Sequence, residues 1–534
     1  MAPVGARAGL LSDRVRQAAA ERVAAGMYPV LVIGVIEDGK SEVSAFGSLP
    51  DGKPADGDTL FEIGSITKTF TATLLAEAVR SGRLQLEDPV AKLLPGTGMP
   101  SYHGRQITLL DLATQHSGLP RLPDNLAPSD PLNPYADYDA TRLKTFLAHY
   151  ALTHEPGAAY EYSNLGLGLL GYALAERAHT SYATLIARKI FRPLGMSMSG
   201  IGLSPPMRAH LAPGFDERRM PAKNWDLAVL AGAGGIRSSA ADMLRYLEAN
   251  LGRGPSPLTA AAALAHQPRR DLGKDERIGL VWMTRSTPDG DIVWHDGMTG
   301  GYASFLGFTA DRRHGVVVLT DIAIDVDDLG FAALLQDAPL APAHQTIPLS
   351  GGALEAYVGT YRLADHFLLE ITRSGDQLYT RATGQETFPI FPRATDEFFA
   401  HVAGIALSFT RDEAGAVNGL VLHQNGDHPA PKLSAAALPP KPQVVTLDAA
   451  LLQDYVGQFQ LRPGIVATIT RTDAQLSVQL TGQPAFPLYA QATDHFFLDV
   501  VDAQIDFERD DGGRVIRLIL HQAGHDRPAP RIAP

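Results

Sequence analysis

The chain has 534 residues, of which 45% are hydrophobic and 19% are charged, and this composition is ordinary for a globular protein. The length is too great for one hydrophobic core, so about two to four domains are expected. The net charge of −12 argues against a general binder of nucleic acids or anionic membranes, because both attract basic surfaces. The absence of cysteine excludes disulfides, thiol catalysis, iron–sulfur clusters and cysteine-bound zinc.

The hydropathy of the chain predicts no membrane span, because it contains no apolar run of about 18 residues. Residues 1–7 also lack the apolar core of a signal peptide. Two locations are therefore expected. The protein is cytoplasmic, or a signal peptide was removed and the protein is periplasmic or secreted.

Residues 1–340 mix strand and helix patterns. Residues 29–36, followed by a turn at 37–40, predict a buried strand that enters a hairpin. Helical patterns follow at 69–81, 108–115, 140–151, 164–178, 181–190 and 239–252, and strand patterns return at 278–285, 291–295, 302–309 and 314–321. This order predicts one antiparallel sheet with an inserted helical region, an α+β domain rather than a βαβ alternation.

Beyond a predicted linker at 339–352, short alternating strands predict all-β modules. Four motifs recur at a spacing of 98 residues: Tyr-Val-Gly from Tyr357 and Tyr455, Thr-Gly-Gln from Thr383 and Thr481, Ala-Thr-Asp-x-Phe-Phe from Ala394 and Ala492, and Leu-His-Gln from Leu422 and Leu520. One spacing shared by four motifs identifies a duplicated domain of about 90 residues. Two small β-barrels or sandwiches are expected at 353–437 and 447–534, joined by the Pro-rich stretch 438–443.

The histidines of the two Leu-His-Gln motifs, His423 and His521, are expected to be structural, because a metal site needs more converging donors. No metal or other cofactor is expected.

A candidate nucleophile lies at the start of an apolar helical run. In the sequence Ser-Ile-Thr-Lys at 65–68, Ser65 and Lys68 share one helix face. A lysine there can take the proton of a serine that is otherwise a weak nucleophile. The tetrapeptide alone is a weak signal, because chance supplies it in a chain of this length. The simpler interpretation is a helix N-terminus with a solvated lysine, so the functional interpretation needs partners elsewhere.

The first set of partners is Tyr-Ser-Asn at 162–164, between a Pro-Gly turn and a glycine-spaced apolar helix. Tyr162 can shuttle a proton if a nearby lysine lowers its pKa. Asn164 can hold both the lysine and a substrate carbonyl. Taken alone, the pair is more simply a buried tyrosine and a helix-capping asparagine.

The second set lies at the end of a strand pattern, in residues 294–302. Gly297 lets a substrate backbone run close to the strand. His295 supplies a hydrogen-bond donor, and a positive charge at low pH. Taken alone, His295 is more simply a satisfied histidine at a sheet edge.

Together, Ser65-x-x-Lys68, Tyr162-x-Asn164 and His295-x-Gly297 resemble, in order, the signature elements of the penicillin-recognising serine hydrolases. This superfamily includes class C β-lactamases, DD-peptidases, D-aminopeptidases and β-lactamase-fold esterases. The surroundings also resemble the class C branch at 84–90, 116–120, 193–196, 233–236, Asp242 and 279–282. The resemblance covers residues 15–325 and implies a β-lactamase/transpeptidase-like catalytic domain within residues 1–340, with an antiparallel sheet and a helical subdomain.

The resemblance also implies roles for individual residues. Ser65 attacks a carbonyl, and Lys68 and Tyr162 exchange its proton, with Tyr162 serving the leaving group. The backbone N–H groups of Ser65 and Met298 form an oxyanion hole, in which each donor typically contributes ~3 kcal/mol. Water then hydrolyses the acyl-enzyme. Either Lys68 or Tyr162 can be the formal base, because strongly coupled groups titrate as a pair.

The third element departs from the family pattern, because it reads His-Asp-Gly where many members have Lys-Thr-Gly. A largely neutral histidine weakens the anchor for a substrate carboxylate at pH 7, so efficient β-lactamase or DD-carboxypeptidase activity is not expected. His-x-Gly is similar to the D-aminopeptidase branch, which also carries two β-barrel domains after the catalytic one.

The leading hypothesis is therefore a serine peptidase or amidase that acts on small peptides or amides, including ones with D-residues. A carboxylesterase of the same fold is the first alternative, and a non-catalytic penicillin- or peptide-binding receptor is the second. The expected partner is a small-molecule or peptide substrate. The β modules are expected to restrict the active-site mouth, to mediate oligomerisation, including a homodimer, or to attach the protein to the cell wall.

Overall fold

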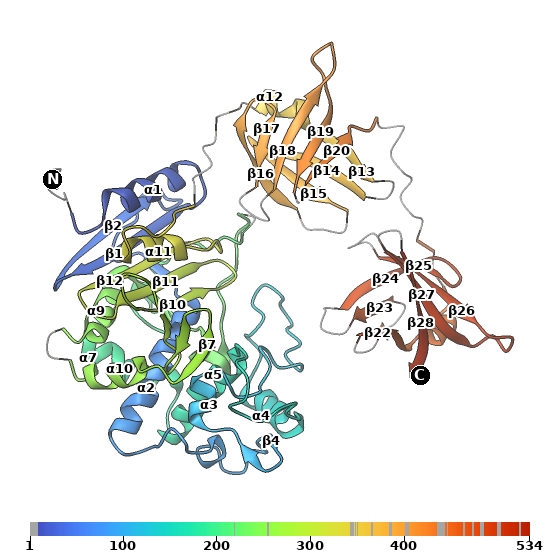
Figure 1. Ribbon diagram of the computed structural model, residues 1–534. Helices are drawn as coiled ribbons and strands as arrows, with labels where there is room; N and C mark the ends of the chain where they lie inside the picture. Colours follow the sequence, from blue (N-terminus) through green and yellow to red (C-terminus); the bar gives the residue numbers. More distant parts are fainter. Residues whose placement is uncertain are drawn as a thin grey trace. The chain divides into compact units, whose positions relative to one another are not determined.

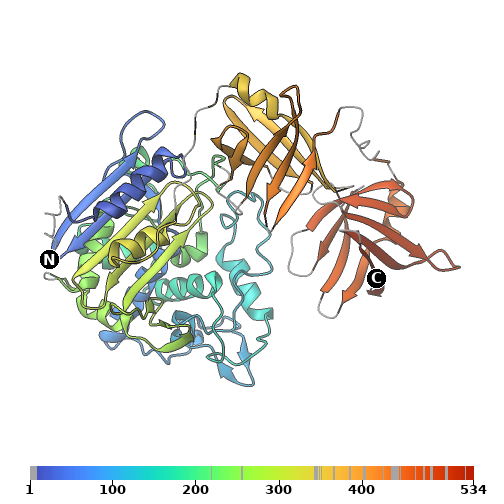
Figure 2. The same cartoon turned by 45° about the horizontal axis from the view of Figure 1, so that its top comes forward.

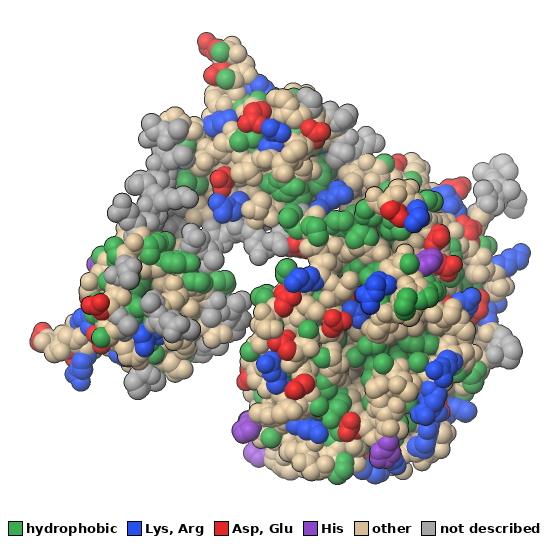
Figure 3. Space-filling view, turned by 180° about the vertical axis from the view of Figure 1, so that it is seen from behind, with side chains coloured by type: hydrophobic (Ala, Val, Ile, Leu, Met, Phe, Trp, Pro, Cys, Tyr) green, Lys and Arg blue, Asp and Glu red, His purple; other side chains and the backbone are tan. Residues whose placement is uncertain are grey.

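The computed structural model describes residues 9–533 with gaps at 218, 254–255, 342–346, 348, 350, 365–366, 384–386, 401–404, 425, 435–443, 446, 463–464, 473–474, 481–484, 499–502 and 523–524. The chain divides into two compact units, Met1–Gln345 and Thr346–Pro534. None of the helices in the described ranges is long and apolar enough to span a bilayer. Figure 3 shows Lys, Arg, Asp and Glu side chains of both signs scattered over the face that it draws.

The described residues of the first unit form an eight-stranded antiparallel sheet in the order β2-β1-β12-β11-β10-β9-β8-β7 (Figure 1). Its strands are β1 Val30–Glu37, β2 Lys40–Gly47, β7 Arg270–Gly273, β8 Glu276–Ile278, β9 Met283–Arg285, β10 Ile292–Met298, β11 Ala303–Thr309 and β12 His314–Thr320. The predicted N-terminal hairpin pairs with the last strand, so that Gly34 faces Val317. The α+β prediction is confirmed.

Helices cover both faces of this sheet. On one face, α1 (Asp13–Ala24) and α11 (Asp327–Leu334) bury apolar side chains against β1, β11 and β12 (Figures 1 and 2). On the other face lies the larger core, with α2 Thr67–Arg80, α3 Leu109–Ala113, α4 Ala140–His149, α5 Asn164–Arg177, α6 Tyr182–Ile186, α7 Arg192–Leu194, α9 Ala240–Leu251 and α10 Thr259–His266. Helix α8 spans Pro205–His210. Two short sheets accompany these helices: β3 Leu60–Glu62 with β6 Arg237–Ser239, and β4 Ser101–Tyr102 with β5 Arg105–Gln106.

The strand predicted at 278–285 is wrong in its middle. Strand β8 ends at Ile278 and β9 begins at Met283, with a buried loop between them. A Cβ on Gly279 would lie 2.5 Å from the carbonyl oxygen of Ala265, and Val281 has a φ of +70°. This backbone cannot continue a strand, although the loop is as apolar as one.

The second unit contains two eight-stranded antiparallel sheets in its described residues. The first follows α12 (Gly351–Leu354) and runs in chain order through β13 Gly359–Ala364, β14 Phe367–Ser374, β15 Gln377–Ala382, β16 Phe388–Ala394, β17 Glu397–Phe399, β18 Ala406–Arg411, β19 Val417–His423 and β20 Asp427–Pro431. It is nearly closed, because Leu433 N–H donates to the carbonyl of Thr360 beside β13.

The second sheet is a closed barrel. It follows α13 (Ala449–Asp454) and consists of β21 Gly457–Arg462, β22 Ile465–Thr472, β23 Gln475–Leu480, β24 Ala485–Ala492, β25 His495–Leu498, β26 Ala503–Arg509, β27 Val515–Gln522 and β28 His525–Ala533. The prediction of two small β-barrel or sandwich domains is therefore confirmed.

The two barrels repeat their internal contacts as well as their motifs. The Tyr357 hydroxyl lies 2.9 Å from Asp396 Oδ1, and the Arg411 guanidinium covers the tyrosine ring at 5.6 Å. The matching contacts of Tyr455, Asp494 and Arg509 measure 2.9 Å and 5.2 Å. Of the recurring Thr-Gly-Gln motif, residues 384–385 and 481–483 lie outside the described residues.

Both Leu-His-Gln histidines contact aspartates of their own barrel. His423 Nδ1 lies 2.7 Å from Asp427 Oδ1, and His521 Nδ1 lies 2.6 Å from Asp526 Oδ1. Within the described ranges, no group of three or more His, Asp or Glu side chains has the arrangement of a metal site.

Candidate active site

Ser65 lies where a short strand turns into a buried helix. After β3, the chain forms a 3₁₀ turn at Gly64–Ile66 and enters α2. Gly64 has a φ of +47°, and a Cβ on it would lie 2.5 Å from the backbone nitrogen of Met298. Glycine is therefore required at this position for both conformation and space. The turn brings Ser65 to the end of β10.

The Ser65 hydroxyl has two polar partners from separate motifs. Lys68 Nζ lies 2.7 Å from Ser65 Oγ, and the Tyr162 hydroxyl lies 2.6 Å from it. Lys68 Nζ also donates to the carbonyl oxygen of Ala233 at 2.7 Å. The Lys68 side chain is fully buried. The first two sequence motifs thus meet at one oxygen atom.

Burial sets the protonation of this cluster. It lowers the pKa of Lys68 to about 7, because the ammonium ion loses its hydration, and the nearby Asp296 carboxylate opposes this shift. Burial also raises the pKa of Tyr162. The condition stated for Tyr162, that a nearby lysine lowers its pKa, is therefore not met. At neutral pH the tyrosine is protonated and the amine titrates.

The turn before α5 positions Tyr162 and Asn164. Ser163, and not the predicted Asn164, caps the helix: its Oγ accepts the N–H of Gly166 at 2.8 Å and donates to the carbonyl of Pro120 at 2.6 Å. Asn164 is the first residue of the helix, and its N–H donates to the carbonyl of Arg121 at 3.1 Å. Its side chain lies near the Tyr135 hydroxyl and opposes the rise that burial causes in the pKa of that phenol.

Strand β10 supplies the facing wall. A Cβ on Gly297 would lie 2.2 Å from the carbonyl oxygen of Ile63 and 3.0 Å from the backbone nitrogen of Ser65. Because Gly297 has no side chain, the turn that carries Ser65 can pack directly against β10. Met298 follows with its side chain 46% exposed, and its backbone nitrogen lies beside Gly64. The backbone nitrogens of Ser65 and Met298 therefore both lie where the Ser65 turn packs against the end of β10.

His295 is buried beside Lys68. Its Nδ1 lies 2.6 Å from the carbonyl oxygen of Asp296. A carbonyl only accepts, so Nδ1 carries the proton and Nε2 of the neutral ring is left as an acceptor. Burial lowers the pKa of His295, and the Lys68 charge lowers it further, while Asp296 opposes both effects. The third element presents a neutral imidazole at neutral pH.

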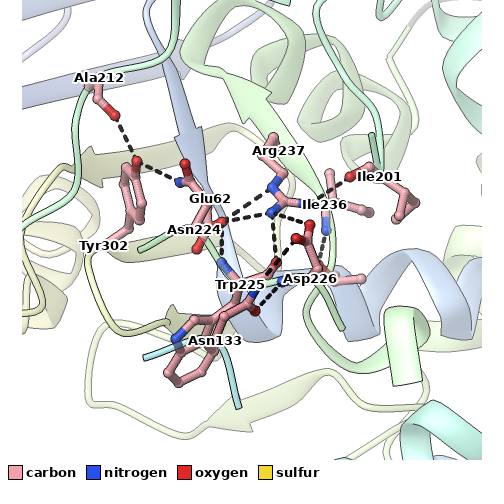
Figure 4. Close-up of polar contacts among 11 residues, drawn as sticks. Glu62, Asn133, Ile201, Ala212, Asn224, Trp225, Asp226, Ile236, Arg237 and Tyr302 are labelled. Carbon is pink, nitrogen blue, oxygen red and sulfur yellow. Dashed lines mark hydrogen bonds and ion pairs between the residues drawn. The ribbon is translucent and has the colours of Figure 1, made fainter. Parts of the chain in front are cut away.

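A buried ion pair supports the turn that carries Ser65. Glu62, three residues before the serine, accepts from Arg237 Nε at 3.2 Å and from the Trp225 N–H at 2.9 Å. Arg237 also donates to the carbonyls of Ile201 and Trp225, each at 2.6 Å, and to Asp226 at 3.3 Å (Figure 4). Burial raises the pKa of Glu62, and the Arg237 charge opposes the shift.

The Glu62–Arg237 pair contacts Trp225, which packs against other parts of the site. The Trp225 ring packs edge-on against Tyr135, with centroids 5.3 Å apart, and a Cβ on Gly300 would lie 2.8 Å from its Nε1. Tyr135 in turn reaches Asn164, and Gly300 follows the end of β10. Through Trp225, the ion pair therefore connects the Ser65 turn with the start of α5 and the end of β10.

Two exposed charges of opposite sign, Arg121 and Asp296, lie beside the reacting groups. The Arg121 guanidinium lies over the Tyr162 ring, 5.1 Å from its centroid. Asp296 follows the buried His295 on β10, and its side chain is 53% exposed. Both charges act on Lys68: Asp296 raises its pKa and Arg121 lowers it.

Sequence reasoning missed four of these features: the Ala233 carbonyl, the Glu62–Arg237 pair, Trp225 and the role of Arg121. A backbone carbonyl leaves no mark in the residue pattern. Glu62 and Arg237 lie 175 positions apart, and only the pairing of β3 with β6 makes them neighbours.

Comparison with known proteins agrees with this geometry. The family model described as Beta-lactamase matches residues 15–337, and the model of a domain of unknown function, DUF3471, matches both 343–434 and 441–529. The D-alanyl-D-alanine-carboxypeptidase/endopeptidase AmpH of Escherichia coli K12 is 30% identical over 305 residues, which cover 53% of this chain and 77% of AmpH.

Two further relatives extend the comparison. Penicillin-binding protein 4* of Bacillus subtilis is 26% identical over 418 residues, which cover 71% of this chain and 89% of that protein. The crystal structure of D-alanine carboxypeptidase AmpC from Burkholderia cenocepacia matches with a TM-score of 0.52 at 27% identity, over 60% of this chain and 97% of that one.

Proposed function

From the premise that this chain belongs to the beta-lactamase family, within the penicillin-recognising serine hydrolases, we propose that its preferred substrates are small peptides and amides, including ones with D-residues. The chain is a serine hydrolase that works through an acyl-enzyme. The observation that carries the assignment of residues is the Ser65 hydroxyl, which has an amine at 2.7 Å and a phenol at 2.6 Å.

In the proposed reaction, Lys68 is the base of the free enzyme. Its pKa of about 7 leaves a substantial fraction as the neutral amine at physiological pH, whereas the raised pKa of Tyr162 keeps the phenol protonated. Lys68 takes the Ser65 proton while Ser65 Oγ bonds to the substrate carbonyl carbon. The N–H groups of Ser65 and Met298 stabilise the oxyanion that forms, at ~3 kcal/mol for each donor.

Collapse of the tetrahedral intermediate breaks the bond from carbon to the leaving group. Tyr162 gives its proton to the departing nitrogen, and the proton that Lys68 took from Ser65 then passes to the phenolate and restores the phenol. A water molecule then attacks the ester carbonyl, its proton passes to the Lys68–Tyr162 pair, and Ser65 is regenerated. Each step uses groups that lie within hydrogen-bond distance of Ser65 Oγ.

The third element supports a preference for substrates other than β-lactams. His295 is neutral and buried, and the exposed charge beside it is the Asp296 carboxylate. This wall therefore offers no fixed cation to a penicillin carboxylate. Asn164 is proposed to contact the acyl half of the substrate, and Gly297 lets the Ser65 turn pack close against β10.

Side-by-side assays test this proposal. We expect turnover of D-amino-acid p-nitroanilides at rates well above those for the chromogenic cephalosporin nitrocefin. Tyr162→Phe should reduce anilide hydrolysis more than hydrolysis of short-chain p-nitrophenyl esters, because a phenolate leaves without a proton. Ester turnover with no amide turnover would instead support the carboxylesterase alternative. A wild-type protein that reacts with none of these acyl donors would support the receptor.

A further inference from the structure

Strand β10 has no cation that could bind a substrate carboxylate, but a cation lies on the opposite wall of the site. His295 is neutral, Asp296 is an anion, and Lys68 is buried and titrates near neutral pH. A substrate carboxylate therefore finds repulsion along β10. Among the described residues, the other cation whose charge acts on both Lys68 and Tyr162 is Arg121, from the loop between α3 and α4.

The backbone fixes Arg121 beside the proton donor. Its carbonyl accepts the N–H groups of Asn164 at 3.1 Å and Leu165 at 3.2 Å, the first two residues of α5. The carbonyl of Pro120, one residue earlier, accepts from Ser163 Oγ. These three bonds tie the loop to the segment that carries Tyr162, and the guanidinium lies 5.1 Å from the tyrosine ring centroid.

The charge of Arg121 is available to a ligand. Its side chain is exposed, and it has no carboxylate partner in the described part of the chain. Other arginines of the same unit are paired with carboxylates, as Arg237 is with Glu62. The field of Arg121 reaches the reacting groups, because it lowers the pKa values of Lys68, Tyr162 and Tyr160.

We propose that Arg121 binds a carboxylate on the leaving-group half of the substrate. This inference rests on the proposed function, in which Tyr162 protonates the leaving group, since the guanidinium lies against that same side chain. A planar guanidinium can hold a carboxylate through two parallel hydrogen bonds. The Asp296 carboxylate, whose charge also acts on Tyr160, repels the carboxylate from the β10 side. The substrate class is peptides or depsipeptides with a free C-terminal carboxylate.

A matched pair of acyl donors tests the anchor. Both are N-acylglycyl thioesters, one with thioglycolate as leaving group and the other with its methyl ester, so that they differ only in the carboxylate. For the wild-type protein, we expect kcat/KM to favour the acid, and the preference to shrink at high salt. Arg121→Met should lower kcat/KM for the acid about tenfold, which corresponds to ~1.4 kcal/mol, and change the methyl ester less than about twofold.

Two further variants make the result decisive. Arg121→Lys keeps the positive charge but loses the planar guanidinium. The ratio of kcat/KM for the acid to kcat/KM for the methyl ester should therefore be intermediate. Arg313→Met is the matched control, because Arg313 lies in the β11–β12 turn, at the end of β11 away from Ala303, and pairs there with Asp38 of the β1–β2 turn. An unchanged ratio in both Arg121 variants overturns the anchor and leaves the proposed function intact. A wild-type protein acylated by neither thioester overturns the proposed function itself, and the anchor with it.

Discussion

The buried pair of Glu62 and Arg237 yields a quantitative prediction about stability. Their side chains are about 2% and 4% exposed. Arg237→Met removes the donors to Glu62 and to the carbonyls of Ile201 and Trp225, and it leaves the carboxylate without its counter-charge. Loss of one partner of a buried ion pair costs about 3–5 kcal/mol, and we expect this loss in the unfolding free energy of the first unit.

The companion variant separates charge from packing. Glu62→Gln keeps an acceptor for the Trp225 N–H and should cost about 1–2 kcal/mol. The double variant leaves no unpaired charge, so its loss should fall short of the sum of the single losses by about 1–3 kcal/mol. Arg313→Met, which breaks the exposed pair with Asp38, serves as the control and should cost less than about 1 kcal/mol.

Urea unfolding followed by tryptophan fluorescence measures these values in the intact chain. The three tryptophans, Trp225, Trp282 and Trp294, all lie in the unit Met1–Gln345, so the barrels do not contribute to the signal. A cost below about 1 kcal/mol for Arg237→Met, or strictly additive losses in the double variant, would refute the view that this pair holds the site together.

Three further predictions concern other parts of the molecule. The rate of acylation should rise with pH through about 7, because the pKa of Lys68 lies well below its ordinary value and only the neutral amine accepts a proton; a flat profile from pH 5 to 9 would contradict this. Gly297→Ala should reduce acylation more than a hundredfold by displacing the Ser65 turn, and preserved acylation kinetics would show that the turn tolerates a Cβ. Asp396→Asn and Asp494→Asn should each destabilise one barrel by about 1–2 kcal/mol in calorimetry, while the fluorescence transition stays in place; a shift of the fluorescence transition would contradict the independence of the units.

The repeating patterns of the sequence predicted most of the regular structure. The helices predicted around Phe70 and Leu169 begin within two residues of the observed α2 and α5, because buried side chains at helical spacing mark them. The loop at 279–282 is apolar enough to resemble a strand, and only the positive φ of Val281 and the contact at Gly279 distinguish it. Seven helices of the described residues were not predicted: α1, α7, α8, α10, α11, α12 and α13.

The residues of the candidate site also fall into those that the sequence predicted and those that it could not predict. Ser65, Lys68 and Tyr162 were predicted from motif spacing, and the structure brings their polar atoms together. The Ala233 carbonyl and Arg121 could not be predicted, because their positions follow from how distant loops pack and not from local pattern. The pKa of Tyr162 could not be predicted for a related reason: burial raises it and outweighs the nearby positive charge of Arg121.

Formation of an acyl-enzyme at Ser65 is tested by intact-mass measurement after exposure to a fluorophosphonate. We expect one adduct for each wild-type chain, mapped to the peptide that contains Ser65, and none on Ser65→Ala. We also expect slow labelling of Lys68→Met, because the hydroxyl then lacks the amine at 2.7 Å. Equal labelling of wild type and Ser65→Ala, or an adduct mapped elsewhere, would contradict an acyl-enzyme at Ser65.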